Sequence, residues 1–238
     1  MKNNVVGVDA CKFGWCIASG IDSPRVHLIQ SLVEARDLLM ESGINLIDMP
    51  MGLPDSSHLR SVETKARKIV PGKSASIFGV PSRKAVYSSS YKEAKAKNKL
   101  EMGKSISIQS WNIVPKIKAL DQIILQTDVD LLEAHPEICF HFLNKENDIL
   151  PSKKSVEGTS KRIQILANWF DETEKVYQQS LLKYKRKDVA KDDVLDALCL
   201  WVVAKLSVRF KLHSISNEKD ALDILMSMHF VDPFNKRP

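Results

Sequence analysis

The order of apolar runs in the first fifty residues constrains the fold more than any other feature of the sequence. The runs cover residues 4–9, 13–21 and 25–30 and, after a segment of helical periodicity over 31–42, residues 44–48. Short turns between the first three runs predict antiparallel strands, because such strands can be joined by tight turns. A helix before the fourth run favours a parallel strand. We therefore predict an α/β fold whose sheet combines an antiparallel ribbon with a parallel extension.

The segment 55–128 differs from the rest, because it contains no convincing strand. We interpret it as a helical insertion after the fourth strand, within a single domain over 1–238. Helical patterns cover residues 57–69, 91–101 and 106–127, and Pro115 should kink or restart the last of them. Beyond it we predict a strand over 130–134, helices over 136–143, 159–182 and 190–208, and a short helix after Ser216.

The positive charge lies in the predicted insertion. The chain has a net charge of +6, and residues 55–128 hold 14 Lys and Arg against 6 Asp and Glu. The remainder holds 21 basic and 23 acidic residues, so it is close to neutral. A basic segment beside a neutral body favours a polyanion such as nucleic acid as partner. A solvated lysine-rich helix face is the alternative.

Composition excludes several classes of protein. The chain is 44% hydrophobic and 27% charged, which is typical of globular proteins. We expect no signal peptide, and we expect no membrane span because the most apolar segment contains Asp196 and Lys205. Four cysteines without zinc-like spacing predict reduced thiols and a cytoplasmic location: Cys11, Cys16, Cys139 and Cys199.

Acidic residues stand in predicted strands where a structural strand has little use for them. Asp9 and Asp48 each close an apolar run, and Glu133 lies in the predicted strand over 130–134. Ligands of α/β sheets bind beyond the carboxyl ends of the strands, so these acids are expected to converge. A turn or capping role explains any one of them alone, but explains all three together less well.

The last strong helical pattern begins with a second acidic group. Asp192, Asp193 and Asp196 lie within one turn, opposite the apolar face of the pattern. A helix start accounts for two aspartates through capping and the helix dipole, but not for Asp196 a turn further on. Carboxylates at such spacing repel one another, so a cation should offset them. Oxygen ligands suit two Mg²⁺ or Mn²⁺ ions, which support phosphodiester hydrolysis.

Several sequence blocks, in order, resemble the family of predicted RNase H-like nucleases, domain of unknown function 429. The blocks are GVDACKFGW, IDMPMGLP, FGVPSRKAV, GKSISIQSWNIVPKI, EAHPEICF and KDDVLDALC, and the similarity runs from about Val5 to Ala204. The resemblance implies an RNase H-like fold with a five-stranded mixed sheet flanked by helices. It settles architecture better than reaction, because the activity of the family is itself inferred from fold.

The resemblance also implies site residues. Acids of such nucleases on the first strand, near the end of the fourth, and on a late helix match Asp9, Asp48 and Asp193. The D-x-x-D-A-L at the last helix is similar to that of Holliday-junction resolvases and adds Asp196 as a metal ligand. Asp192 competes with Asp193 for its position. Glu133 is a catalytic candidate that could bind metal, orient a ligand or pair with a basic residue.

Other residues are candidates for substrate contact or support of the site. Lys12 could neutralise the acids, and Arg83 could clamp a phosphate, with a plain surface arginine as the alternative. Lys104 and Gln109 could reach the site, although capping or packing explains them equally well. His135 could act as a base or orient water, or could cap a strand-to-helix turn.

These features predict a metal-dependent nuclease acting on RNA, DNA, a hybrid or a branched junction. A nucleic-acid or protein-binding module without turnover is the alternative. An ATP-dependent phosphotransferase is less favoured, because kinases of this fold use two such domains around one nucleotide.

Overall fold

The computed structural model describes residues 4–70, 72–146 and 148–235, which form two compact units. The unit that we call the sheet unit comprises the described residues of 1–48, 128–213 and 229–238. The second, which we call the helical unit, comprises those of 49–127 and 214–228. It therefore contains almost all of the predicted insertion and a later segment that the sequence did not associate with it.

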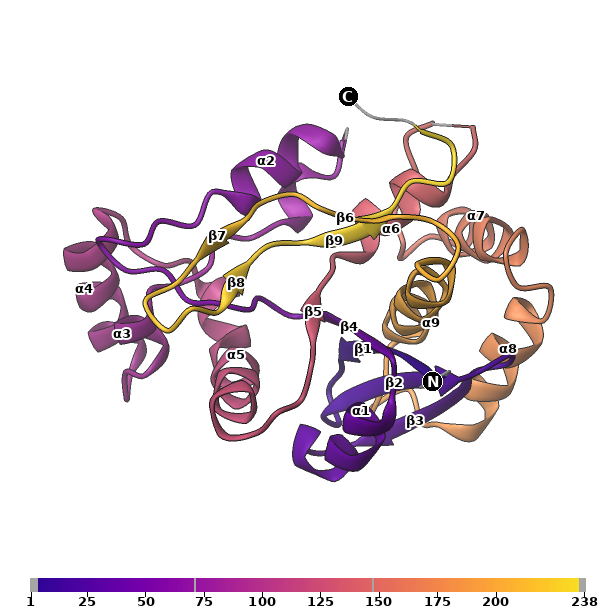
Figure 1. Ribbon diagram of the computed structural model, residues 1–238, viewed down its shortest axis with the longest axis horizontal. Coiled ribbons are helices and arrows are strands. Elements are labelled where there is room, and N and C mark those ends of the chain that lie inside the picture. Colours follow the sequence, from indigo (N-terminus) through magenta and orange to yellow (C-terminus); the bar gives the residue numbers. More distant parts are fainter. Residues whose placement is uncertain (1–3, 71, 147, 236–238) are drawn as a thin grey trace. The chain divides into compact units, whose positions relative to one another are not determined.

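The sheet unit is built on a five-stranded mixed sheet (Figure 1). Its strands are β1 (Val5–Ala10), β2 (Trp15–Gly20), β3 (Arg25–Ile29), β4 (Ile44–Asp48) and β5 (Leu132–Glu133). The strand order is β3-β2-β1-β4-β5, with antiparallel pairing from β1 to β3 and parallel pairing from β1 through β4 to β5. The predicted α/β class and mixed sheet are confirmed, and the arrangement is consistent with an RNase H-like fold.

The connection from β3 to β4 explains the switch to parallel pairing. A 3-10 turn η1 (Leu32–Ala35) leads into helix α1 (Arg36–Glu41) where one helix over 31–42 was predicted. Ser31 begins it with a capping box, since its hydroxyl accepts from the Val33 N–H and Glu34 accepts from the Ser31 N–H. The connection returns the chain to the start of the sheet, so β4 runs parallel to β1.

Four helices complete the sheet unit: α6 (Pro136–Leu143), α7 (Val156–Ala167), α8 (Thr173–Lys183) and α9 (Lys191–Leu206). The single amphipathic helix predicted over 159–182 is thus two helices. The N–H groups of Trp169 and Phe170 both donate to the carbonyl of Leu166, which tightens and ends α7. Within the described residues no helix is long and apolar enough to cross a bilayer.

Helix α9 is the centre of the sheet unit. It packs against β1, β2 and β4, and α6, α7 and α8 pack around it (Figure 1). Nearly all its residues beyond the first turn are buried. Gly7 of β1 allows the close approach, because a Cβ there would lie 2.3 Å from the Ala197 carbonyl oxygen and the Trp201 nitrogen. Trp201 adds a hydrogen bond of 3.0 Å from its indole N–H to the Gly20 carbonyl.

The helical unit contains the helices that the sequence predicted and a hairpin that it did not. Its elements are α2 (Val62–Ile69), η2 (Ser74–Ser76), α3 (Arg83–Val86), α4 (Tyr91–Met102), α5 (Ile108–Gln126), β7 (Glu218–Lys219) and β8 (Leu225–Met226). Helix α5 passes through Pro115 without restarting. β6 (Leu212–Ser214) pairs with β9 (His229–Val231) in a separate two-stranded sheet.

The prediction of a short helix after Ser216 is wrong. The carboxylate of Asp220 accepts from the N–H groups of Leu222 and Ile224, which bends the chain into a turn between β7 and β8. Its second oxygen accepts from Leu53 N–H and from Arg83 at 2.6 Å. These bonds satisfy a buried carboxylate within the helical unit, and they favour the turn over a helix.

We expect Gly7→Ala to destabilise the protein by about 3 kcal/mol, the upper end for overpacked cores, because the added methyl meets helix backbone that cannot rotate away. Urea unfolding measures the change. Gly79→Ala is the matched control, since a Cβ at Gly79 meets nothing within 4 Å. Equal stabilities for the two variants would contradict the described packing of α9 on β1.

Candidate functional site

Two of the predicted acids lie side by side at the carboxyl ends of neighbouring strands. The parallel pairing of β1 with β4 places Asp9 opposite Asp48. Residues in register on adjacent strands share a face of the sheet, so both carboxylates project from the same face. Asp9 is buried, and its Oδ1 accepts from the N–H of Ala10 at 2.8 Å. The two strand ends therefore bring a buried acid, Asp9, beside a half-buried one, Asp48.

Helix α9 brings further carboxylates to this pair. Gly7 and Asp9 share a face because side chains alternate along a strand, and α9 crosses that face at Ala197. Asp196 precedes Ala197, and Asp193 lies about one turn earlier. The loop before α9 is also fixed, since the Phe13 N–H donates to the Asp188 carbonyl at 2.8 Å. The close contact at Gly7 thus places the acidic first turns of α9 beside β1.

The surroundings of Asp9 and Asp48 raise the pKa of both carboxyl groups. Burial raises the pKa of Asp9 well above its usual value, and repulsion from Asp48, Asp196 and Asp193 raises it further, while Lys153 opposes the change. Burial likewise raises the pKa of Asp48, against the attraction of His135 and Lys153. Several carboxylates thus lie close enough to repel one another in a poorly hydrated place.

Lys153 places its ammonium against this group, and no local pattern in the sequence predicted it. Its Nζ lies 2.7 Å from Asp196 Oδ2 and 3.3 Å from Asp192 Oδ2. Burial raises the pKa of Asp196 to about 7; Lys153 opposes this, and Asp48 adds to it. The pKa of Lys153 is raised, because the attraction of Asp196, Asp9 and Asp192 outweighs the burial of its ammonium.

Asp192 and Asp193 have different partners. Asp193 Oδ2 accepts from the Ala190 N–H at 2.7 Å, so this residue reaches back to cap the start of α9. Burial raises the pKa of Asp193, whereas the capping bond lowers it. Asp192 faces Lys153 instead. Asp193 therefore both caps α9 and lies close to Asp9, whereas Asp192 pairs with Lys153 at the edge of the group.

Glu133 lies in β5 and His135 lies just after it, and the two residues are placed differently with respect to Asp48. Glu133 is in register with Ile47 rather than Asp48, so strand alternation directs its buried side chain to the opposite face. His135 is the N-cap of α6, and its Nδ1 accepts from the Glu137 N–H at 3.2 Å. A neutral ring therefore carries its proton on Nε2, whereas a protonated ring would attract the carboxylate of Asp48 and lower its pKa.

Of the remaining predicted residues, one belongs to the sheet unit and three to the helical unit. Lys12 is exposed in the turn after β1. Arg83 belongs to the helical unit, where its guanidinium contacts Asp121 and Asp220 at 2.6 Å each. Lys104 and Gln109, in the same unit, are exposed, and the Lys104 carbonyl accepts from Asn98. Arg83 thus already has carboxylate partners within its own unit.

A buried ion pair that was not predicted from the sequence lies beside the loop that carries Lys153. Arg162 of α7 is fully buried, and its Nη2 donates to both oxygens of Glu137 at 2.7 and 2.8 Å. Its Nη1 donates to the Pro151 carbonyl at 2.9 Å, which fixes the loop that carries Lys153. The available signal was an arginine on the apolar face of a helical pattern, three and four residues before Ile165 and Leu166.

The comparisons identify the family of the chain. A family model described as protein of unknown function, DUF429, matches residues 7–219. The chain belongs to this family. The curated proteins and the solved structures gave no match. The resemblance expected from the sequence blocks is confirmed at the level of family, and the matched span of this DUF429 protein contains Asp9, Asp48, Asp193 and Asp196.

The side chains of the site are of the chemical type that binds hard divalent cations, but they do not form a compact metal-binding group. Among the residues that the structure describes, no three His, Cys, Asp or Glu side chains form a group that could hold a metal ion. Carboxylate oxygens are the ligands that Mg²⁺ and Mn²⁺ prefer. In this DUF429 protein, burial and the repulsion from Asp48, Asp196 and Asp193 raise the pKa of Asp9 although Lys153 opposes the change, so a further cation would relieve this repulsion.

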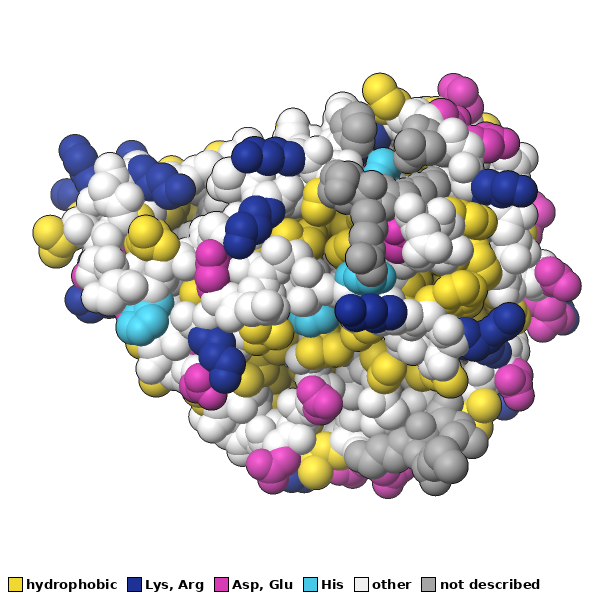
Figure 2. Space-filling model, turned by 45° about the horizontal axis from the view of Figure 1, so that its top comes forward, with side chains coloured by type: hydrophobic (Ala, Val, Ile, Leu, Met, Phe, Trp, Pro, Cys, Tyr) yellow, Lys and Arg dark blue, Asp and Glu magenta, His cyan; other side chains and the backbone are white. Residues whose placement is uncertain are grey.

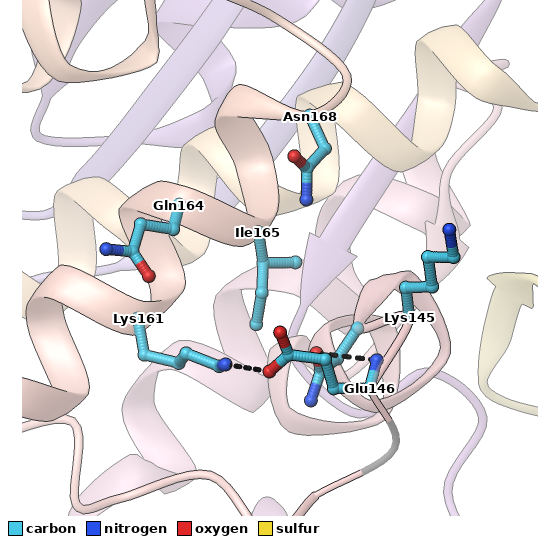
Figure 3. Close-up of a pocket in the computed structure, with 7 residues that line it drawn as sticks. Lys145, Glu146, Lys161, Gln164, Ile165 and Asn168 are labelled. Carbon is cyan, nitrogen blue, oxygen red and sulfur yellow. Dashed lines mark hydrogen bonds and ion pairs between the residues drawn. The ribbon is translucent and has the colours of Figure 1, made fainter.

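A pocket elsewhere in the sheet unit has a different character. It has a volume of about 320 Å³ and is lined by Asn144, Lys145, Glu146, Lys161, Gln164, Ile165 and Asn168 (Figure 3). Lys161 is paired with Glu146 across it, as the dashed line in Figure 3 marks. Its lining shares no residue with the carboxylate group, so we do not treat it as the functional site.

The raised pKa of Asp9 predicts that Asp9→Asn stabilises the protein by an amount that depends on pH. The folded state holds the Asp9 proton more tightly than the unfolded state, so ionisation above about pH 4 destabilises the fold. In EDTA, we expect the variant to be more stable than the parent by about 1–2 kcal/mol at about pH 8, with the difference closing toward pH 4.

Urea unfolding across this pH range measures the difference. The matched control is Asp37→Asn, because the Asp37 side chain is 90% exposed. A gap that is constant with pH, or equal in the control, would contradict the described environment of Asp9.

Proposed function

We propose that this protein is a divalent-metal-dependent nuclease that hydrolyses phosphodiester bonds in RNA or DNA. Asp9, Asp48, Asp193 and Asp196 would hold Mg²⁺ or Mn²⁺, with two ions in the complete site. The observation that carries the proposal is the group of carboxylates from β1, β4 and α9, of which Asp9 and Asp196 are buried. Burial and the repulsion from the neighbouring acids raise the pKa of Asp9. Such a group destabilises a fold unless it binds a cation, so its presence favours a function.

The chemistry divides between the metal and the side chains. When bound, the metal would lower the pKa of a water molecule and stabilise the leaving oxygen. Asp9 and Asp48 would hold one side of the site from rigid strand ends, and Asp193 and Asp196 the other side from α9. Placing ligands on strands and a buried helix keeps their geometry fixed, which a hydrolytic site requires.

Three further residues have proposed supporting roles. His135 would orient water or a phosphate oxygen through Nε2, because its Nδ1 is engaged at the start of α6. Asp192 would hold Lys153 at the edge of the site. For Glu133 we propose support of β5 from the opposite face of the sheet rather than direct metal binding, since it pairs in register with Ile47.

We propose nucleic acid as the partner, bound through the basic face of α4. Lys92, Lys95 and Lys99 are exposed at spacings of three and four residues, which places them on one side of the helix. Figure 2 shows Lys and Arg side chains gathered at the end of the view where Figure 1 places α4. Evenly spaced lysines suit a phosphate backbone, because they contact charge without reading sequence.

We also propose a cytoplasmic location. No disulfide joins the four cysteines, which are all described and all buried, and this is compatible with a reducing compartment.

The nuclease proposal predicts metal-dependent cleavage that Asp9→Asn abolishes. Labelled single-stranded RNA, single-stranded DNA, RNA–DNA hybrid and a four-way junction are incubated with protein and Mn²⁺. We expect cleavage of at least one substrate by the parent chain, and a loss of at least about a hundredfold in the variant, as for a ligand that stabilises transition-state charge. Asp37→Asn, purified in the same way, should retain the activity.

Two other outcomes would contradict the proposal. Equal cleavage by the parent and Asp9→Asn would indicate a contaminating nuclease. No cleavage by either, together with retained nucleic-acid binding, would favour the binding module that carries the fold without turnover. The existing pair between Lys153 and Asp196 is the observation that favours this second function, because it partly compensates the acids without a metal.

The basic face of α4 predicts a salt-dependent loss of binding. Replacing Lys92, Lys95 and Lys99 by glutamine should lower the slope of log affinity against log salt concentration by about two to three, because each phosphate contact releases a counterion. Fluorescence anisotropy with labelled single-stranded RNA measures the slope. The charge-matched control replaces the exposed Lys185, Lys187 and Lys211, and an equal effect there would argue against a site on α4.

A further inference from the structure

The side chain of Lys153 forms its ion pairs with α9 and not within its own loop. It lies between α6 and α7, and its Nζ reaches the carboxylate of Asp196 at 2.7 Å. Asp196 is 2% exposed, whereas the Lys153 side chain is 36% exposed. The ion pair therefore joins a buried acid of the proposed metal site to a lysine that has solvent on one side.

The loop that carries Lys153 is firmly built. Arg162 donates to the carbonyl of Pro151 at 2.9 Å, and the Ser155 hydroxyl donates to the carbonyl of Ser152 at 2.8 Å. Ser155 also caps α7, since its hydroxyl accepts from the Gly158 N–H at 3.0 Å. A Cβ on Gly158 would lie 2.0 Å from the Ser152 carbonyl oxygen, so the loop packs tightly on the helix. The backbone of Lys153 is thus held in place, and only its side chain is free to move.

The ammonium and a divalent cation would require the same atoms. Asp196 Oδ2 accepts from Lys153, and the charge of Lys153 also acts on Asp9, Asp48 and Asp193. A cation bound by these acids would repel the ammonium at short range, where the surroundings are poorly hydrated. The lysine stem is flexible, and its exposed side gives the ammonium a path to water.

We propose that Lys153 is a tethered competitor of the divalent cation: its ammonium leaves Asp196 when the cation binds, and it thereby sets the affinity of the site. This inference rests on the proposed metal site. Lys153 stabilises the acids until a cation replaces it, and it raises the cation concentration at which the site fills. Its role is regulatory, and it need not touch the substrate.

The test is a calorimetric titration of the full chain with MnCl₂ at fixed pH and ionic strength. Lys153→Met keeps the length of the stem and removes the charge. We expect it to bind Mn²⁺ at least about tenfold more tightly than the parent chain, since a single competing charge is lost. Lys153→Arg keeps the charge and should bind Mn²⁺ no more tightly than the parent.

Two controls separate this effect from a general change in charge or folding. Lys154→Met removes a charge from the next position, where the side chain is exposed, and should leave the affinity unchanged. Thermal unfolding in EDTA should show a lower Tm for Lys153→Met, and Mn²⁺ should raise that Tm by more than it raises the Tm of the parent. This readout does not depend on nuclease activity.

The outcomes distinguish failure of the inference from failure of the proposed function. Mn²⁺ binding that is equal in the parent and Lys153→Met, or weaker in the variant, would overturn the competition while leaving the metal site intact. Equal tightening in Lys154→Met would also overturn it, because the effect would then be one of net charge. Absence of Mn²⁺ binding in every form would overturn both the metal site and the role of Lys153.

Discussion

The contact between α9 and β1 at Gly7 is the constraint on which the sheet unit depends. A helix can lie this close to a strand only where the strand has no side chain, and a Cβ at Gly7 would fall 2.3 Å from helix backbone. The contact buries the apolar length of α9 and leaves its acidic first turns beside the end of β1. Packing and site geometry therefore share one cause. A change that moved α9 outward would weaken the core and, at the same time, separate Asp196 from Asp9.

The same arrangement that assembles the candidate site lowers the stability of the folded state. Burial near Asp48, Asp193 and Asp196 raises the pKa of Asp9, so the ionised site opposes folding. Lys153 pairs with Asp196, and the nearby Glu137 pairs with Arg162. A fold selected for stability alone would replace some of these carboxylates by apolar side chains. Their retention in a buried place is the physical argument for a cationic ligand.

Local patterns in the sequence predict most of the fold, and contacts between distant residues account for what they miss. The predicted bounds of β4 and α6 agree with the structure, because an apolar run and an N-terminal proline act locally. The hairpin after Ser216 was missed, since the bonds of Asp220 to Leu53 and Arg83 span more than a hundred positions. The acids at strand ends could be placed together from topology. Lys153 could not, because nothing distinguishes it locally from Lys154.

The interleaving of the two units has a consequence for the emergence of the chain from the ribosome. The helical unit is formed by residues 49–127 and 214–228, and the sheet unit by the segments on either side of both. The partner of Arg83 at Asp220 is translated long after α3, so neither unit can be completed while synthesis is under way near α9. Both must wait with apolar surface uncovered until the segments that follow α9 appear. Nascent chains of this architecture therefore expose, late in synthesis, the kind of apolar surface that promotes aggregation.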